Sequence, residues 1–244
     1  MATSPPIQPQ IDTILVPQGI EFRKVSRGLW ATGQTQCRVV SIPLGSQGLT
    51  RFLDQWLGAQ EQKNYPQNVV LMGLCGSLSP EIQGGNVVIY QGCTGRIGHR
   101  SDFVQRCNPE LTDCIEQKLH AVAVVKTIQR VQGFTSDRVI SSAQEKQQIH
   151  QIYQADVVDM EGFIVLEHLN SQGISGAILR VVSDGCHQDL PDLNSAIDDD
   201  GNLQILPLLT VFLQQPAAAA QLIQGSIKAL RVLQEITTGL GTQT

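Results

Sequence analysis

The chain has 244 residues and a formal net charge of −5, with 41% of its residues hydrophobic and 16% charged. This length fits one domain, and the acidic balance argues against a nucleic-acid partner because a phosphate backbone is bound by a basic stripe. No apolar run approaches the roughly 20 residues of a membrane-spanning helix.

We therefore expect one folded domain at residues 11–238, with a flexible N-terminal tail at residues 1–10 and a C-terminal tail at residues 239–244. The six cysteines include no C-x-x-C pair, which indicates free thiols in a reducing compartment and gives no sign of a zinc or redox site. The N-terminus lacks the basic and apolar segments of a signal peptide. Together these features predict a cytoplasmic protein.

The first half of the chain alternates short apolar runs with one clear helical pattern. Residues 14–16 are a predicted buried strand that ends at Pro17, and residues 37–44 are the next strand. Between residues 49 and 57, apolar side chains follow the i, i+3, i+4, i+7 spacing of an amphipathic helix. Residues 69–78 are a continuous apolar run, which predicts a central parallel strand buried on both faces.

Helix-start signals mark the second half of the chain. Asn108 and Pro109 supply a cap and a first-turn proline for one helix. Ser142 opens a capping box before another helix, whose Ile149 and Ile152 are expected to face the core. Further strands are predicted at residues 86–89, 121–128, 157–158 and 179–182, and further helices at residues 163–169 and from Pro216 onward. Strands and helices that alternate in this way predict an α/β protein, a three-layer α/β/α sandwich around a mixed, twisted sheet.

Carboxylates stand at the ends of two of these strands. Asp159 and Glu161 flank Met160 directly after one strand and at the start of a helix, and Ser183 and Asp184 follow the later strand. Acidic groups at strand exits in an α/β sheet are well placed to meet a polar ligand. The sequence therefore predicts a small-molecule site at this edge of the sheet.

These two motifs together resemble the paired signature of the nucleoside phosphorylase and nucleosidase superfamily. That superfamily includes purine nucleoside phosphorylases and methylthioadenosine/S-adenosylhomocysteine nucleosidases. Residues 73–78 resemble its G-x-A/C-G-G/S-L segment, in which Gly76 lets a ligand approach the backbone, and the order of segments after Asp184 looks most like the hopanoid-associated branch. The resemblance implies a nucleoside substrate, a homo-oligomer, and no metal, nicotinamide or flavin.

The resemblance also implies a role for each residue of the site. Asp184 would protonate or hydrogen-bond purine N7, and burial is expected to keep it partly protonated near pH 7. Glu161 would accept hydrogen bonds from the ribose hydroxyls, and Met160 would pack under the sugar. Glu21 would activate the attacking water, and its alternative interpretation is a solvated acid at the start of a helix. The expected substrate-binding set is completed by Asp159, Ser183, Gly76 and Val139.

Three positions depart from the superfamily's pattern. Leu74 stands where relatives commonly carry a serine that faces phosphate or water, which weakens the phosphorylase interpretation. Val139 stands where adenine-specific nucleosidases carry an aromatic ring that stacks on the base, and Phe134 is the alternative ring. Residues 17–20 stand in place of the sequence that usually precedes the corresponding glutamate in relatives. The identity of the base is therefore open.

Three functions stay open on the sequence. The first is a nucleosidase that cleaves a purine nucleoside, with adenine favoured, by means of water. The second is a phosphate-dependent phosphorylase, whose phosphate-binding candidates are Arg96, Arg100, Arg51 and Ser46. The third is a non-catalytic nucleoside-binding protein. The acidic run at residues 198–200 lacks the spacing of a calcium loop and predicts a turn.

Overall fold

The computed structural model describes residues 9–59, 65–96, 103–191 and 214–242. Within these segments eight strands form one mixed sheet. The strands are β1 (Thr13–Pro17), β2 (Arg38–Ile42), β3 (Asn68–Ser77), β4 (Val87–Arg96), β5 (Val104–Arg106), β6 (Ile128–Ser136), β7 (Val157–Asp159) and β8 (Ser175–Asp184). They lie in the order β2-β1-β3-β7-β6-β4-β5, and β8 pairs with β3 and β4 beside that path.

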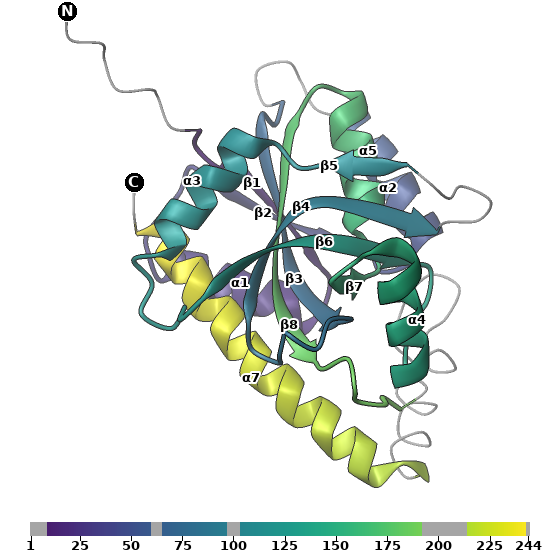
Figure 1. Ribbon diagram of the computed structural model, residues 1–244. Helices are drawn as coiled ribbons and strands as arrows, with labels where there is room; N and C mark the ends of the chain where they lie inside the picture. Colours follow the sequence, from purple (N-terminus) through teal and green to yellow (C-terminus); the bar gives the residue numbers. More distant parts are fainter. Residues whose placement is uncertain (1–8, 60–64, 97–102, 192–213, 243–244) are drawn as a thin grey trace, which may run out of the picture.

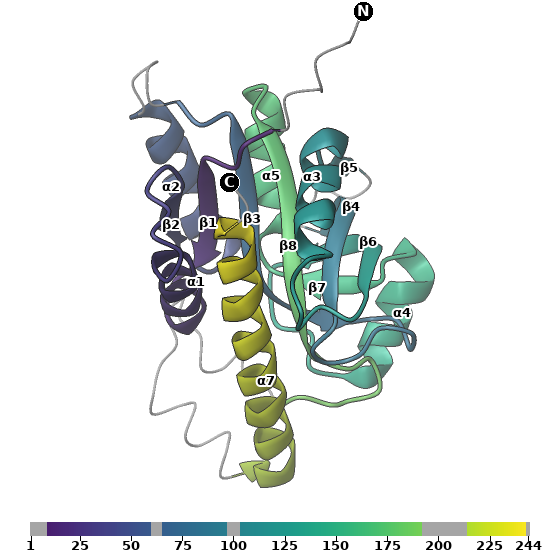
Figure 2. The ribbon, with the colours of Figure 1, turned by 90° about the vertical axis from the view of Figure 1, so that its left-hand side faces the viewer.

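Helices cover both faces of this sheet (Figure 1, Figure 2). They are α1 (Ile20–Trp30), α2 (Ser46–Gly58), α3 (Pro109–Leu119), α4 (Ala143–Tyr153), α5 (Gly162–Ser171) and α7 (Pro216–Gly241). Helices α1, α3 and α7 pack on one face, α2 and α5 pack on the other, and α4 packs against β6 and β7. This arrangement confirms the three-layer α/β/α sandwich with a mixed sheet.

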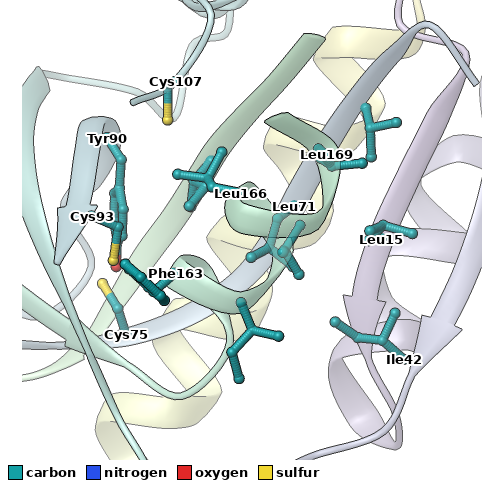
Figure 3. Close-up of a cluster of buried hydrophobic side chains, with 14 of the residues drawn as sticks. Leu15, Ile42, Leu71, Cys75, Tyr90, Cys93, Cys107, Phe163, Leu166 and Leu169 are labelled. Carbon is teal, nitrogen blue, oxygen red and sulfur yellow. The ribbon is translucent and has the colours of Figure 1, made fainter. Parts of the chain in front are cut away.

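Side chains alternate between the two faces of the central strands, which divides the core into two large clusters. In β1, Leu15 points to the cluster under α2 and α5, whereas Ile14 and Val16 point to the cluster under α1, α3 and α7. In β3, Leu71 and Met72 divide in the same way. Figure 3 shows the first cluster, with side chains of α5 lying over the sheet. Burial on both faces explains why these strands are continuous apolar runs in the sequence.

The strand directions bring several chain segments to one edge of the sheet. Strands β1, β3 and β8 are parallel, so their carboxyl ends lie at the same edge. Strand β7 is antiparallel to β3 and pairs Val158 with Gly76, so the chain leaves β7 beside the end of β3. The loop after β1, the end of β8 and the segment after β7 therefore converge.

The expected strand at residues 121–128 is wrong for most of its length. Residues 121–127 form turns and irregular backbone, and β6 begins only at Ile128. The backbone N–H groups of Val122 and Val125 close turns back to residues three positions earlier, while their side chains pack against the core. The valines are therefore apolar because they pack, and not because they pair in a sheet.

The helix ends agree better with the sequence. The side chains of Asn108 and Ser142 accept the expected capping hydrogen bonds at the starts of α3 and α4. Both Ile149 and Ile152 of α4 were expected to face the core. Ile149 is buried, but Ile152 is 71% exposed. Helix α7 begins at Pro216 as expected but continues through Gly241, past the expected domain end at residue 238.

All six cysteines are free thiols, and five of them are buried. Burial raises the pKa of the Cys75 and Cys93 thiols well above the usual value, so both behave as small apolar groups. Among the helices in the described part of the chain, none combines the length and the apolar composition that crossing a bilayer requires.

Candidate active site

A cavity of about 260 Å³ opens at the edge where the ends of β1, β3, β7 and β8 converge. The structure brings to its wall all eight residues that the sequence singled out: Glu21, Gly76, Val139, Asp159, Met160, Glu161, Ser183 and Asp184. Four of the eight are acidic, so the cavity combines carboxyl groups with one arginine, Arg138, and with apolar side chains that include Leu44, Leu74 and Leu222.

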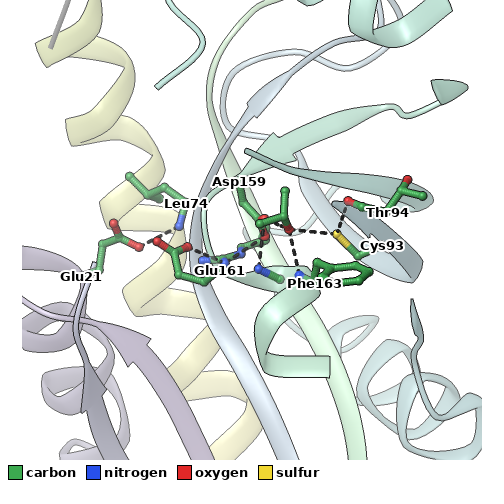
Figure 4. Close-up of polar contacts among 10 residues, drawn as sticks. Glu21, Leu74, Cys93, Thr94, Asp159, Glu161 and Phe163 are labelled. Carbon is green, nitrogen blue, oxygen red and sulfur yellow. Dashed lines mark hydrogen bonds and ion pairs between the residues drawn. The ribbon is translucent and has the colours of Figure 1, made fainter. Parts of the chain in front are cut away.

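Glu21 lies in the first turn of α1, and its carboxyl group is turned toward the sheet. The Leu74 amide N–H donates a hydrogen bond to Glu21 Oε2 at 2.8 Å (Figure 4). Burial raises the pKa of the Glu21 carboxyl, although the nearby Arg180 and the Leu74 N–H lower it. This placement differs from that of a solvated helix-start acid, because the carboxyl group is desolvated and faces the cavity.

Arg180, in the middle of β8, is fully buried and holds two of the acids. Its Nη2 atom donates to Asp159 Oδ2 at 3.0 Å and to Glu161 Oε2 at 2.9 Å. The other oxygen of Asp159 accepts hydrogen bonds from the Thr135 hydroxyl at 2.7 Å and the Gly162 N–H at 3.1 Å. Both oxygens of Asp159 are thus engaged by the protein, so Asp159 orients Arg180 and the start of α5.

Glu161 has a different environment, since among the described residues only Arg180 donates a hydrogen bond to its carboxyl group. Burial raises the pKa of the Glu161 carboxyl to about 7; Arg180 lowers it, and the neighbouring Asp159 and Glu21 raise it further. Near neutral pH this carboxyl group therefore exchanges a proton readily, and its second oxygen is available to a ligand in the cavity.

Part of the Arg180 guanidinium has no partner in the described part of the protein, although Arg180 lies behind the cavity wall and not in it. Within the described residues, its Nε and Nη1 atoms are buried without a hydrogen-bond partner, which is costly unless a bound molecule satisfies them. A side chain at Gly73 would collide with both Arg180 Nη1 and Glu21 Oε2. Because glycine stands there, an N–H donor and a carboxylate acceptor lie next to each other beside the cavity.

Asp184 ends β8 and is buried. The Ser183 hydroxyl lies 2.6 Å from Asp184 Oδ1, within donating distance, and 3.1 Å from the Cys75 carbonyl oxygen. A Cβ atom at Gly76 would lie 3.0 Å from Asp184 Oδ2, so this glycine gives the carboxylate its room against β3.

Lys146 is a site residue that the sequence analysis missed. It is fully buried in α4, and its Nζ atom donates to Asp184 Oδ2 at 2.7 Å. The expectation that burial alone governs the protonation of Asp184 omitted this ammonium group. One signal pointed to it, since Lys146 stands three residues before the buried Ile149 and so shares the inward face of its helix.

The base-recognition segment contributes an aliphatic surface. Val139 and Ile140 line the cavity, whereas Phe134 does not. The Phe134 ring is buried against Tyr153, with ring centroids 4.6 Å apart. Phe134 therefore does not replace the missing aromatic ring, and its contact with α4 explains why it is apolar.

The phosphate-binding candidates do not gather at this cavity. Ser46 and Arg51 belong to α2 and are absent from the described lining. The side chain of Arg96 and the whole of Arg100 lie outside the described residues, as do residues 198–200. Among the residues that are described, no group of three His, Cys, Asp or Glu side chains could hold a metal ion.

A larger cavity of about 970 Å³ lies between α1 and β2. Its described lining includes Arg23, Arg27 and Trp30 but no acid and no histidine. It therefore lacks a group for proton transfer, and the smaller cavity is the candidate active site on the basis of its chemistry.

A family model described as the phosphorylase superfamily matches residues 59–206 of the chain. No curated protein matches the sequence. Among solved structures, 5′-methylthioadenosine/S-adenosyl homocysteine nucleosidase of Helicobacter pylori has a TM-score of 0.68 at 12% identity, covering 97% of this chain and 100% of that one. The nucleosidase of the same name from Campylobacter jejuni has a TM-score of 0.62 at 14% identity, covering 93% and 99%. Futalosine hydrolase of Helicobacter pylori has a TM-score of 0.64 at 14% identity, covering 93% and 97%.

Proposed function

The chain belongs to the phosphorylase superfamily, and on this premise we propose that it releases the base of a purine nucleoside by cleaving the N-glycosidic bond with water. The observation that carries the proposal is the convergence of three carboxyl groups, those of Glu21, Glu161 and Asp184, on one cavity. The reaction has two requirements, and the three carboxyl groups together meet them.

The first requirement is a leaving base that can accept the electron pair of the broken bond. When the bond between C1′ and the base nitrogen breaks, this pair stays on the base, which leaves more readily when it is protonated. Asp184 lines the cavity and can give the base a proton or a hydrogen bond. The sugar meanwhile gains positive charge, which the ionised Glu161 stabilises while it accepts hydrogen bonds from the hydroxyls.

The second requirement is an activated nucleophile. The oxygen of a water molecule bonds to C1′, and the proton that this water loses passes to Glu21. The raised pKa of the Glu21 carboxyl makes its ionised form a stronger base. The unpartnered Nη1 of Arg180 lies beside Glu21 and can hold the water in place.

The charge of the cavity supports water over phosphate as the nucleophile. The guanidinium of Arg180 is already shared by Asp159 and Glu161, and Glu21 adds a third carboxyl group beside it. An incoming phosphate would meet three carboxyl groups and one guanidinium there, and Arg138, an arginine of the cavity wall, is paired with Glu145. Leu74 adds an apolar side chain, and its N–H already donates to Glu21.

The lining supports a substrate with an apolar 5′ group. The apolar side chains of Leu44, Leu190 and Leu222 line the cavity, and Val139 offers the base an aliphatic surface. Two of the similar structures are named as nucleosidases of 5′-methylthioadenosine. We therefore place 5′-substituted adenine nucleosides first among the substrates.

The test is base release followed by chromatography. Adenosine, methylthioadenosine, S-adenosylhomocysteine, inosine and a 5′-alkyl adenosine are each incubated with and without phosphate. We expect adenine release without phosphate, and a loss of at least about 100-fold in kcat/KM for Asp184→Asn. Asp54→Asn is the control, because Asp54 is an exposed acid on α2 whose side chain is 69% exposed.

The other outcomes would each point elsewhere. Release that requires phosphate would make the protein a phosphorylase and remove Glu21 from the role of base. Nucleoside binding without release from any of the five compounds would contradict an enzymatic function. Full activity of Asp184→Asn would contradict the assignment of the acid.

A further inference from the structure

Lys146 is the residue of the site that the proposed reaction leaves unexplained. Lysine is rarely fully buried without a partner, yet the exposed fraction of Lys146 is 0%. Its Nζ atom donates to Asp184 Oδ2 at 2.7 Å, to the Gly185 carbonyl oxygen at 3.1 Å and to the Gln188 carbonyl oxygen at 3.0 Å. These three acceptors use all three protons of an ammonium group, so the site is built for a charged lysine.

Lys146 does not line the cavity. A nucleoside bound there would touch Asp184 but not the lysine. Any effect of Lys146 on the reaction must therefore pass through the carboxylate that it holds, or through the backbone of the segment that follows β8.

We propose that Lys146 is a positioning residue for Asp184. It fixes Oδ2 from the α4 side and holds the carboxyl group at the wall of the cavity, where the base would bind. This inference rests on the proposed function, because it assigns Lys146 to the acid of that reaction.

The neighbourhood of Asp184 makes Lys146 the cation in direct contact with it. The other titratable or charged side chains around this end of β8 include Cys75, Arg180, Asp159, Glu161, Glu21, Arg138, Lys228, His187 and Asp189. Cys75 is kept neutral because burial raises its thiol pKa. Arg180 is engaged by the two acids of the neighbouring cluster, and His187 and Asp189 are exposed.

The segment after β8 ties the position of Lys146 to that of Asp184. The Ala143 N–H at the start of α4 donates to Asp189 Oδ1 at 2.7 Å, and the Leu190 N–H donates to the Ser141 carbonyl oxygen at 2.8 Å. Together with the two carbonyl contacts of Lys146, these bonds hold α4 and the end of β8 as one unit. The distance between ammonium and carboxylate is therefore fixed by the fold.

The test compares Lys146→Met, which keeps the length of the side chain without its charge, with Lys228→Met. Lys228 is an exposed lysine on α7 that donates to the Gly84 carbonyl oxygen, and it is the matched control. In Lys146→Met the neutral form of Asp184 persists to higher pH, so the upper pH limit of base release should rise by about one unit or more. At the optimum pH, kcat should fall while KM stays within about twofold, because Lys146 does not touch the nucleoside.

A lysine that serves stability alone would lower the melting temperature without moving the pH limit, and that result would overturn the proposal. The 13C resonance of the Asp184 carboxyl group, assigned by its absence in Asp184→Asn, is a second measurement, made on the wild type and on Lys146→Met. We expect the pH midpoint of this resonance to be higher in Lys146→Met than in the wild type, and equal midpoints would overturn the proposal; if Lys146→Met does not fold, Lys146→Gln is measured in its place. If the wild type releases no base, the proposed function fails, while this resonance still tests the effect of Lys146 on Asp184.

Discussion

Arg180 is the centre of a cluster in which three carboxyl groups compete for one guanidinium. Asp159 takes the most complete set of hydrogen bonds, from Arg180, Thr135 and Gly162. Glu161 and Glu21 are left with fewer donors and remain desolvated, which explains why the pKa of each is raised. The same unequal division leaves Asp159 fully engaged by the protein, whereas Glu161 and Glu21 keep fewer partners.

Replacing Glu21 by glutamine removes the proposed base while keeping the shape of the side chain. We expect Glu21→Gln to lower kcat for base release by at least about 100-fold, since the glutamine cannot accept the proton of water. Steady-state kinetics on the best nucleoside of the panel measures this loss. Glu110→Gln is the matched control, because Glu110 also lies in the first turn of a helix but is exposed.

A different result would reassign the residue. If Glu21→Gln retained wild-type kcat while Glu110→Gln did the same, Glu21 would serve only to accept the Leu74 N–H, and the nucleophile would be activated by another group.

The residues of the site divide into those that sequence reasoning can find and those that it cannot. Glu161 and Asp184 stand at strand ends within local motifs, which is why the sequence could single them out. Their shared location depends on the pairing of the short strand β7 with the end of β3, because β7 runs antiparallel to β3 and β8. Lys146 is 38 positions from Asp184 in the sequence, and no local spacing links a lysine on a helix to that carboxylate. The lack of partners at Arg180 Nε and Nη1 could not be predicted from the sequence either, because it depends on the packing around β8.

Helices α1 and α7 pack closely against each other on one face of the sheet (Figure 2). Gly28 of α1 lies at this contact, where a Cβ atom would come within 2.6 Å of the Gln234 carbonyl oxygen and 2.9 Å of Thr237 Cβ. A methyl group cannot fit there unless the helices move apart. The helix that carries Glu21 is therefore positioned by a backbone contact with the C-terminal helix.

We expect Gly28→Ala to destabilise the protein by about 1–3 kcal/mol, because overpacking outweighs the gain in helix propensity. Gly58→Ala at the end of α2 is the control, since nothing lies within 4 Å of its Cβ position. That substitution should be neutral or stabilising by up to about 1 kcal/mol. Urea unfolding of both variants measures the difference, and equal stabilities would contradict the close approach of α1 and α7.

Elements were predictable where local chemistry decides them. The caps at Asn108 and Ser142 are hydrogen bonds between neighbours in the sequence, and the structure confirms both. Residues 121–127 were wrongly expected to be a strand, because the valines there are partly buried against the core cluster under α1, α3 and α7 and do not pair in the sheet. An apolar run alone does not say which partner buries it.

The whole molecule places its charged cluster between two apolar cores. Residues of β1, β3 and β8 fill both cores with alternate side chains. The buried acids Asp159, Glu161 and Asp184 lie near the ends of β7 and β8, and Arg180 reaches Asp159 and Glu161 from the middle of β8. The layered fold was predictable from the alternation of strands and helices. The free-energy cost of burying these acids was not predictable, because it depends on the hydrogen-bond donors that the assembled fold supplies.

That cost makes the stability of the whole chain depend on pH. In the folded protein the pKa of Glu161 is raised from 4.5 to about 7, so between these values the folded chain holds a proton that the unfolded chain has lost. Raising the pH removes that proton and favours unfolding. The stabilisation is therefore present below pH 4.5 and is lost as the pH rises toward 7, and Glu21 acts in the same direction.

Glu161→Gln cannot ionise and should lack this part of the pH dependence. Between pH 4.5 and 7, we expect the free energy of unfolding of the wild type to fall relative to that of the variant by on the order of 2–3 kcal/mol. Urea unfolding of both proteins at several pH values measures the difference, and Glu110→Gln should follow the wild type because Glu110 is exposed. A constant difference between wild type and Glu161→Gln across this range would mean that Glu161 is ionised in the folded protein, held so by Arg180.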